Sequence, residues 1–267
     1  MQNKSKELET AILAALEAGK VLEKYFETEI LKDFKEDKSI VTLADKESEE
    51  IIKKIIFGAF PEHSILGEET GMNGERGKES EYVWHVDPVD GTRNFANGIP
   101  LFAVSIALER KGEIIVGVVY NPATHSLFYA EKGSGAYLND NKIFVSKDNT
   151  DHAIVTVSPG KERHIILELY HDLPKVVRSV RNLGATALEL AYVARGGLEA
   201  NIQLGRNVSY DFAAGVFLVQ EAGGKITNLD GSSWKFPENH LIASNGVFHD
   251  MLVDEVQRQI KKLMPSA

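Results

Sequence analysis

The chain has 267 residues, of which 43% are hydrophobic and 26% are charged, and none is cysteine. This length and composition are typical of one or two globular domains, and the lack of cysteine excludes disulfides, thiolate zinc sites, iron–sulfur clusters and a cysteine nucleophile. The 39 acidic residues exceed the 30 basic ones, which argues against a nucleic-acid partner because such a surface has to pair with phosphates.

A membrane partner is not expected either. There is no run of about 18 apolar residues, the length that a transmembrane helix needs. The polar start MQNKSKELET carries no apolar signal core. We therefore expect a cytoplasmic protein.

Two helices are predicted first. Apolar residues at spacings of three and four indicate a helix over residues 8–26, and the charged stretch 31–39 is expected to form an exposed loop or hairpin. The second helix is predicted over 45–57. Its isoleucines are expected to be buried and four charged side chains to be exposed, namely Glu49, Glu50, Lys53 and Lys54.

Short strands separated by turn residues come next, after a first strand at 63–67. They predict an antiparallel meander with strands at 82–86, 102–108, 114–120, 126–130 and 142–146. We interpret His85, Trp84 and Trp234 as structural residues.

After about residue 150 strands and helices alternate, which favours a layered α/β arrangement. The expected strands are 153–158, 198–203, 225–229 and 241–244, and the expected helices are 161–170, 185–197, 211–224 and 247–264. The polar segment 146–151 separates the predicted meander from the part in which strands and helices alternate. We therefore predict two closely packed parts, 1–148 and 149–267.

The segment WHVDPVDGTRNF, residues 84–95, has the residue types of a metal and phosphate site. A turn fixed by Pro88 would let Asp87 and Asp90 point the same way. Gly91 permits a close backbone approach, and the N–H groups after it would open a helix turn that binds an anion. Oxygen donors favour Mg²⁺ over zinc, although the same residues are also typical of a plain tight turn.

Further acidic residues lie at predicted strand ends and helix starts. Glu68 and Glu69 follow a strand, while Asp45 in VTLADKES and Asp211 in SYDFAAG each open a helix. Each has a simpler structural explanation, which is a solvated turn for the glutamates, a capping box with Thr42 for Asp45, and a helix cap for Asp211. Together they gather where α/β folds form ligand crevices.

These motifs resemble those of the inositol monophosphatase family. GEET, DPVDGTRNF, VTLAD and YDFAAG have the order and approximate spacing seen in that family, and the resemblance covers nearly the whole chain. It implies a five-layer αβαβα sandwich, a homodimer, and hydrolysis of phosphate monoesters with two to three Mg²⁺ ions.

The resemblance also implies metal ligands. Glu68, Asp87 and the carbonyl of Val89 would hold one metal. A second metal would be held by Asp87, Asp90 and Asp211. Glu68 would reach a third, weaker metal through water.

Catalytic and substrate-binding roles follow from the same resemblance. The implied catalytic residues are Glu68, Thr92 and Asp45, of which the last two would orient or deprotonate the attacking water. The amides of Gly91 and Thr92 would bind phosphoryl oxygens. The full set of implied substrate residues is Asp90, Gly91, Thr92, Gly184, Ala185, Gln203, Arg206 and Asp211.

The chain departs from the family pattern on the substrate side. Gln203 lies near the position where the family has an acidic residue that binds an inositol hydroxyl. Gly184-Ala185-Thr186 has the residues of the family's usual Gly-Thr-Ala in a different order. Arg206 and Arg93 would either face a second phosphate or be ordinary surface charge. These departures bear on substrate choice more than on hydrolysis.

We therefore expect a phosphatase of a small phosphorylated polyol or sugar, with inositol 1-phosphate as the first substrate. The alternatives are fructose 1,6-bisphosphate, alone or as a second activity, and then histidinol phosphate or adenosine 3′,5′-bisphosphate. A regulatory protein that kept the fold is a hypothesis of another class. It is disfavoured because no expected ligand is missing.

Overall fold

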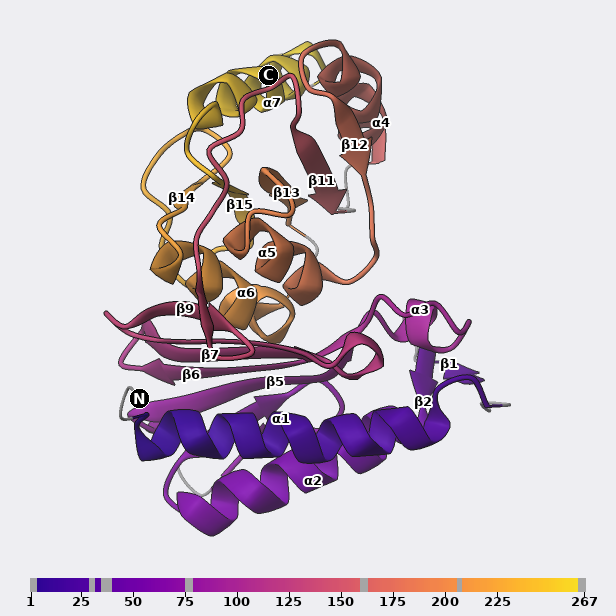
Figure 1. Ribbon diagram of the computed structural model, residues 1–267, viewed down its shortest axis with the longest axis vertical. Helices are drawn as coiled ribbons and strands as arrows, with labels where there is room; N and C mark the ends of the chain where they lie inside the picture. The colour runs from indigo at the N-terminus through magenta and orange to yellow at the C-terminus, as the bar shows by residue number, and fades with distance from the viewer. Residues whose placement is uncertain are drawn as a thin grey trace.

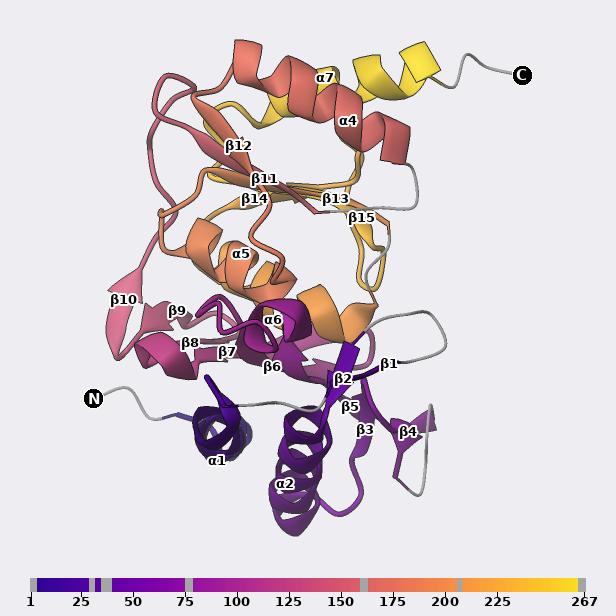
Figure 2. The same cartoon turned by 90° about the vertical axis from the view of Figure 1, so that its right-hand side faces the viewer.

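The computed structural model describes residues 4–28, 32–34, 40–74, 79–158, 163–205 and 208–263. These residues form five layers in the order helix, sheet, helix, sheet, helix (Figures 1 and 2). The αβαβα sandwich that the resemblance implied is therefore confirmed. None of the described helices is long and apolar enough to cross a membrane.

Helices form the outer and middle layers. One outer layer contains α1 (Lys6–Tyr25) and α2 (Leu43–Ala59), and the middle layer contains α5 (Thr186–Ala194) and α6 (Ser209–Glu221). The other outer layer contains α4 (Arg163–Asp172) and α7 (His249–Leu263). The single-turn helix α3 (Thr92–Phe95) follows an inner strand of the larger sheet, Tyr82–Asp90.

The larger sheet has eight strands and contains the predicted meander. In spatial order they are β10 (Asn141–Ile143), β9 (Gly135–Leu138), β8 (Ser126–Glu131), β7 (Glu113–Asn121), β6 (Ala103–Arg110), β5 (Tyr82–Asp90), β3 (Ser64–Gly67) and β4 (Gly71–Asn73). The strands β5 to β10 pair antiparallel, as expected. The β3 strand pairs parallel to β5, which brings the carboxyl ends of both strands to the same edge.

The smaller sheet has five strands in the order β12 (Ser179–Arg181), β11 (Ile154–Ser158), β13 (Ala200–Leu204), β15 (His240–Ser244) and β14 (Lys225–Thr227). The β11 strand pairs parallel with both neighbours, and the other pairs are antiparallel. The connection between β10 and β11 contains the predicted boundary after residue 148, and the division into two domains stays a prediction.

Two local predictions have clear outcomes. Within the charged stretch 31–39, residues 32–34 form β1 (Lys32–Phe34), which pairs antiparallel with β2 (Ile40–Thr42) as in a hairpin, and the rest of the stretch lies outside the described residues. The strand predicted over 142–146 is wrong beyond Ile143. There the Val145 N–H donates to the Ala222 carbonyl after α6, so the chain leaves the sheet and Phe144 is 62% exposed.

Strand alternation explains why helices cover both faces of the larger sheet. Along β6, Val104, Ile106 and Leu108 pack toward α1 and α2, whereas Ala103 and Ala107 pack toward the middle helices. Small residues on the second face let α6 lie close. A Cβ on Gly117 would come within 3.0 Å of the Ala214 carbonyl oxygen.

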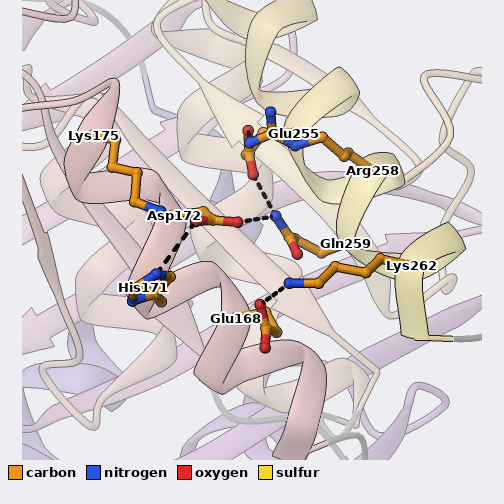
Figure 3. A network of polar contacts seen from close by, with 8 residues as sticks. All are labelled: Glu168, His171, Asp172, Lys175, Glu255, Arg258, Gln259 and Lys262. Atoms are coloured by element: carbon orange, nitrogen blue, oxygen red, sulfur yellow. Dashed lines mark hydrogen bonds and ion pairs between the residues drawn. The ribbon is translucent and has the colours of Figure 1, made fainter.

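The outer helices α4 and α7 are joined by polar side chains as well as by an apolar core (Figure 3). The Gln259 amide donates to Asp172 Oδ2 at 2.5 Å and to Glu255 Oε1 at 2.7 Å. Lys262 of α7 pairs with Glu168 of α4 at 2.5 Å. These contacts fix how α7 lies along α4 on the outside of the smaller sheet.

Candidate active site

The end of β5 places two predicted ligands side by side. Asp87 pairs with Ser105 of β6 and Asp90 pairs with Ala103, and the register shifts between the two pairs. Pro88 has no N–H to offer the ladder, so this irregularity is where the strand is expected to bend. Both carboxylates are buried, with Asp87 3% and Asp90 5% exposed.

Asp90 is held by a helix from the other half of the chain. Its two carboxylate oxygens accept hydrogen bonds from the backbone N–H groups of Thr186 at 2.8 Å and Leu188 at 3.2 Å. These N–H groups belong to the first turn of α5, where an α-helix has no internal acceptors. Asp90 therefore caps α5 from a distant strand and ties the predicted substrate segment to β5.

Asp45 combines the two roles that the sequence left open. Its Oδ2 accepts from the Thr42 backbone N–H at 2.8 Å and from the Thr42 hydroxyl, so the predicted capping box of α2 is confirmed. Its Oδ1 lies 3.3 Å from Thr92 Oγ1. That hydroxyl is also 3.1 Å from the Val89 carbonyl oxygen. The start of α2 thus contacts the turn after β5.

Asp211 has the same local position in α6 as Asp45 has in α2. It is the third residue of its helix, and its Oδ2 accepts from the Val208 backbone N–H at 2.7 Å. A carboxylate at a helix N-terminus is favoured by the helix dipole. The α6 helix packs on β5 and β6, which brings Asp211 to the predicted ligands of the first half.

Glu68 lies on the turn after β3, and a second glutamate holds that turn. The Glu68 N–H donates to the Val86 carbonyl of β5 at 3.0 Å. The Glu49 carboxylate of α2 accepts from the backbone N–H groups of Glu69 at 2.8 Å and Thr70 at 3.0 Å. The prediction that Glu49 is exposed is wrong, since it is fully buried. It lies four residues after Asp45, on the helix face that meets the turn.

Burial and neighbouring charges raise the pKa of two of these carboxyls, Asp87 and Asp90. Burial raises the pKa of the Asp87 carboxyl well above its usual range, and the charges of Glu68, Asp90 and Asp211 raise it further. Burial also raises the pKa of Asp90, although the hydrogen bond from the Leu188 N–H acts to lower it. In the described part of the chain, no three His, Cys, Asp or Glu side chains are spaced to hold one metal ion as they stand.

The predicted substrate segment around Gly184 and Ala185 is held by hydrogen bonds to side chains of α5 and α3. Glu189 is buried, and its Oε1 accepts from the N–H groups of Leu183 at 2.6 Å and Gly184 at 3.2 Å. The Asn94 amide of α3 donates to the Leu183 carbonyl at 2.7 Å. Ala185 is buried against Gly91, whose added Cβ would lie 3.0 Å from Ala185 Cβ. Sequence reasoning did not identify Glu189 or Asn94.

The remaining substrate candidates differ in where the structure places them. Gln203 is fully buried on β13, where it pairs with Ser158 and Leu241. Arg206 lies outside the described residues. Arg93 is exposed on α3, next to Thr92.

His85 joins the strand that carries Asp87 to the helix that carries Asp211. Its Nδ1 lies 2.8 Å from Ser209 Oγ of α6, and its Nε2 lies 2.9 Å from Glu109 Oε2. The structural interpretation of His85 is therefore confirmed. Trp84 is fully buried, with its Nε1 donating to His63 Nδ1 at 3.1 Å, and is structural as well.

The site thus combines acidic side chains from the turn after β3, the end of β5, α2 and α6 with the N-terminus of the short helix α3. The sequence pattern described as the Inositol monophosphatase family matches residues 3–261. The chain belongs to the inositol monophosphatase family. As a member it is a phosphoric monoester hydrolase, and the family is metal-dependent.

Individual members show the range of the family. A protein of Aquifex aeolicus named fructose-1,6-bisphosphatase/inositol-1-monophosphatase is 38% identical, over 98% of this chain and 99% of its own. A protein of Pasteurella multocida named Nus factor SuhB is 36% identical, over 89% of this chain and 90% of its own. The solved structure of an IMPase of Thermotoga maritima has a TM-score of 0.89 and 31% identity, and covers 97% of this chain and 100% of that one.

Proposed function

We propose that this protein is a Mg²⁺-dependent phosphatase that hydrolyses inositol 1-phosphate, as a homodimer in the cytoplasm. The main support is the position of Asp87, which is buried beside Glu68, Asp90 and Asp211. Repulsion among buried carboxylates is relieved by a bound cation, so this arrangement is expected where a metal is required. Names of similar proteins support the substrate class.

The donor atoms fit magnesium by their chemistry. The carboxylates of Glu68, Asp87, Asp90 and Asp211 and the Val89 carbonyl are all oxygen donors, which Mg²⁺ prefers. They would hold two to three ions, with Asp87 shared between two. When bound, such ions acidify a water molecule and offset the charge of the phosphate dianion.

Thr92 and Asp45 would handle the proton of the attacking water. In the proposed step, Thr92 Oγ1 takes a proton from the water while its own proton passes to Asp45 Oδ1, 3.3 Å away. The Asp45 Oδ2 keeps its bonds to Thr42, so the side chain does not turn. The water oxygen forms the new P–O bond, the bond to the leaving oxygen breaks, and that oxygen takes a proton from water.

The backbone around Gly91 would hold the phosphoryl group. Gly91 has φ +88°, a conformation that a residue with a side chain rarely adopts, and it precedes the first turn of α3. The N–H groups of Gly91 and Thr92 would donate to phosphoryl oxygens and stabilise their growing charge. The nearby segment at Gly184 and Ala185 would contact the alcohol part of the substrate.

Fructose 1,6-bisphosphate is the second candidate substrate. Arg93 is exposed next to the phosphate-binding turn, and the Aquifex aeolicus relative is named for both activities. If Arg206 binds a second phosphate, Arg206→Ala will reduce turnover of the bisphosphate far more than turnover of inositol 1-phosphate. Equal losses on both substrates would remove this candidate.

The test is release of inorganic phosphate from inositol 1-phosphate and from fructose 1,6-bisphosphate, with Mg²⁺ and with a chelator. We expect Mg²⁺-dependent release with preference for the monophosphate. No release from either would contradict the proposal and favour histidinol phosphate, adenosine 3′,5′-bisphosphate or a regulatory role. A stable protein partner whose binding survives Asp90→Asn would support that regulatory role.

A further inference from the structure

The turn that carries Glu68 is attached to the rest of the molecule at two points. On one side the Glu68 N–H donates to the Val86 carbonyl of β5. On the other side the Glu49 carboxylate accepts from the N–H groups of Glu69 and Thr70 and from the Thr70 hydroxyl. We propose that Glu49 is a positioning residue that fixes this turn and thereby sets the affinity for the divalent cation. The inference rests on the proposed function, in which Glu68 is a metal ligand.

The contact is closely packed, which makes Glu49 hard to replace. A Cβ on Gly67, the last residue of β3, would lie 2.6 Å from the Glu49 carboxyl carbon and 2.6 and 2.7 Å from its two oxygens. Such distances are far below van der Waals contact, so only glycine fits there while Glu49 keeps its place. The Glu49 side chain therefore fills the space under the turn.

The bonding of Glu49 indicates positioning and not metal binding. Its Oε1 accepts from two donors of Thr70 and its Oε2 accepts from Glu69 N–H. A buried carboxylate is stable when donors of this kind share its charge. Both oxygens are thus already engaged by the turn, while Glu68 reaches Asp87 from the same turn.

Glu49 also links two parts of the site through one helix. Asp45 and Glu49 are four residues apart on α2 and lie on the same face. Asp45 meets Thr92 after β5, and Glu49 meets the turn after β3. A shift of Glu68 relative to Thr92 would have to deform this end of α2 or break the Glu49 contacts.

The test uses Glu49→Gln, which keeps the shape but turns one oxygen into an NH₂ group that faces an N–H donor. The matched control is Glu50→Gln, the same change one residue on, where the side chain is 66% exposed and pairs with Lys53. Affinity is measured directly by electron paramagnetic resonance of Mn²⁺ titrated into each protein. Phosphate release is then measured against Mg²⁺ concentration.

We expect Glu49→Gln to bind Mn²⁺ about 10- to 100-fold more weakly, the usual effect of losing a group that orients a metal ligand. At saturating Mg²⁺ its kcat should return to within about twofold of the wild type, because the reacting groups are unchanged. Glu50→Gln should match the wild type in both measurements. A Glu49→Gln variant with wild-type Mn²⁺ affinity, or with a kcat that saturating Mg²⁺ does not restore, would overturn the inference.

Thr70→Val provides a second variant that tests the same contact with little risk to folding, because Thr70 is exposed. It removes one donor to Glu49 and keeps both backbone bonds, so Mn²⁺ affinity should fall by a few-fold. Unchanged affinity would count against the inference even if Glu49→Gln does not fold. Wild-type protein that binds Mn²⁺ but releases no phosphate would defeat the proposed function and leave the inference on Glu49 standing.

Discussion

Asp87, a proposed metal ligand, is expected to reduce the stability of the metal-free protein. It is buried, its Oδ1 accepts from the Val89 N–H at 2.9 Å, and its pKa is raised by burial and by neighbouring carboxylates. Such a group is unfavourable until a cation binds. The residues that make the proposed site are therefore expected to lower the stability of the metal-free protein.

Asp87→Asn tests this expectation. The asparagine side chain keeps the shape and can still accept the hydrogen bond from the Val89 N–H, and it removes the repulsion between Asp87 and the neighbouring carboxylates. We expect the variant to be about 1–3 kcal/mol more stable than the wild type in chelator at pH 8, and to lose more than about 100-fold in phosphate release. Thermal unfolding in chelator checks the stability, and saturating Mg²⁺ should abolish the advantage. An equal or lower melting temperature in chelator would contradict this explanation.

Gly91 is the second residue whose chemistry is tied to its position. Its φ of +88° strains any residue with a side chain, and a Cβ there would lie 2.9 Å from the Leu101 carbonyl oxygen. Gly98→Ala is the matched control, because Gly98 has φ +69° but open space around its Cβ.

We expect Gly98→Ala to cost about 1–2 kcal/mol through backbone strain alone and to leave KM unchanged. Gly91→Ala should cost more, because Ala185 must also move, and should raise KM for the phosphate ester. Urea unfolding and steady-state kinetics measure both effects. Equal stability and equal KM for the two variants would show that the contact between Gly91 and Ala185 has no role.

At the scale of elements, His249 joins α7 to the smaller sheet. Its Nδ1 lies 2.7 Å from Ser244 Oγ of β15, and its Nε2 lies 2.8 Å from Thr227 Oγ1 of β14. Burial lowers the pKa of His249 from its usual 6.5 to about 4. The unfolded chain therefore takes up this proton near pH 6.5, whereas the folded protein does so only near pH 4.

Stability is thus expected to fall as pH decreases through that window, since the unfolded state binds the proton first. His249→Gln keeps a polar group toward Thr227 and cannot titrate. Between pH 7 and pH 5 the wild type should lose about 2 kcal/mol more than the variant in the free energy of unfolding. Urea unfolding at both pH values gives the difference, in which other histidines cancel. Parallel losses would mean that folding does not lower the pKa of His249.

The helices were the part of the fold most open to prediction, because their apolar spacing is local. The helix predicted over 45–57 is α2, Leu43–Ala59. The same spacing could have placed Glu49 correctly, since it lies three residues before Ile52 and seven before Ile56, both fully buried. Its charge was taken as a sign of exposure, whereas its hydrogen bonds come from a turn that is distant in sequence.

The short strands and the tertiary contacts of the site were beyond local patterns. The β12 strand has three residues and no alternation of its own, and it forms only because β11 lies beside it. The sequence identified Asp90 as a ligand candidate but not its bonds to Thr186 and Leu188, nearly a hundred residues later. Motifs thus indicate which groups act, and the packing of α5 and α6 determines where they meet.

At the scale of the whole molecule, the proposed site depends on both halves of the chain. Asp87 and Asp90 come from β5 of the larger sheet, Glu68 follows β3 of the same sheet, and Asp211 comes from α6 in the middle layer. The middle helices pack on both sheets, so their position sets how Asp211 faces β5. The His85–Ser209 contact holds the same two elements together.

The most direct test of this account is to count the Mg²⁺ ions bound per chain by calorimetry, for the wild type and for Asp211→Asn, and to measure phosphate release from inositol 1-phosphate on the same samples. We predict about two to three ions for the wild type, at least one fewer for the variant, and a loss of more than about 100-fold in release. If Asp211→Asn binds the same number of ions and releases phosphate at the wild-type rate, the second half of the chain does not contribute to the metal site and the account is wrong.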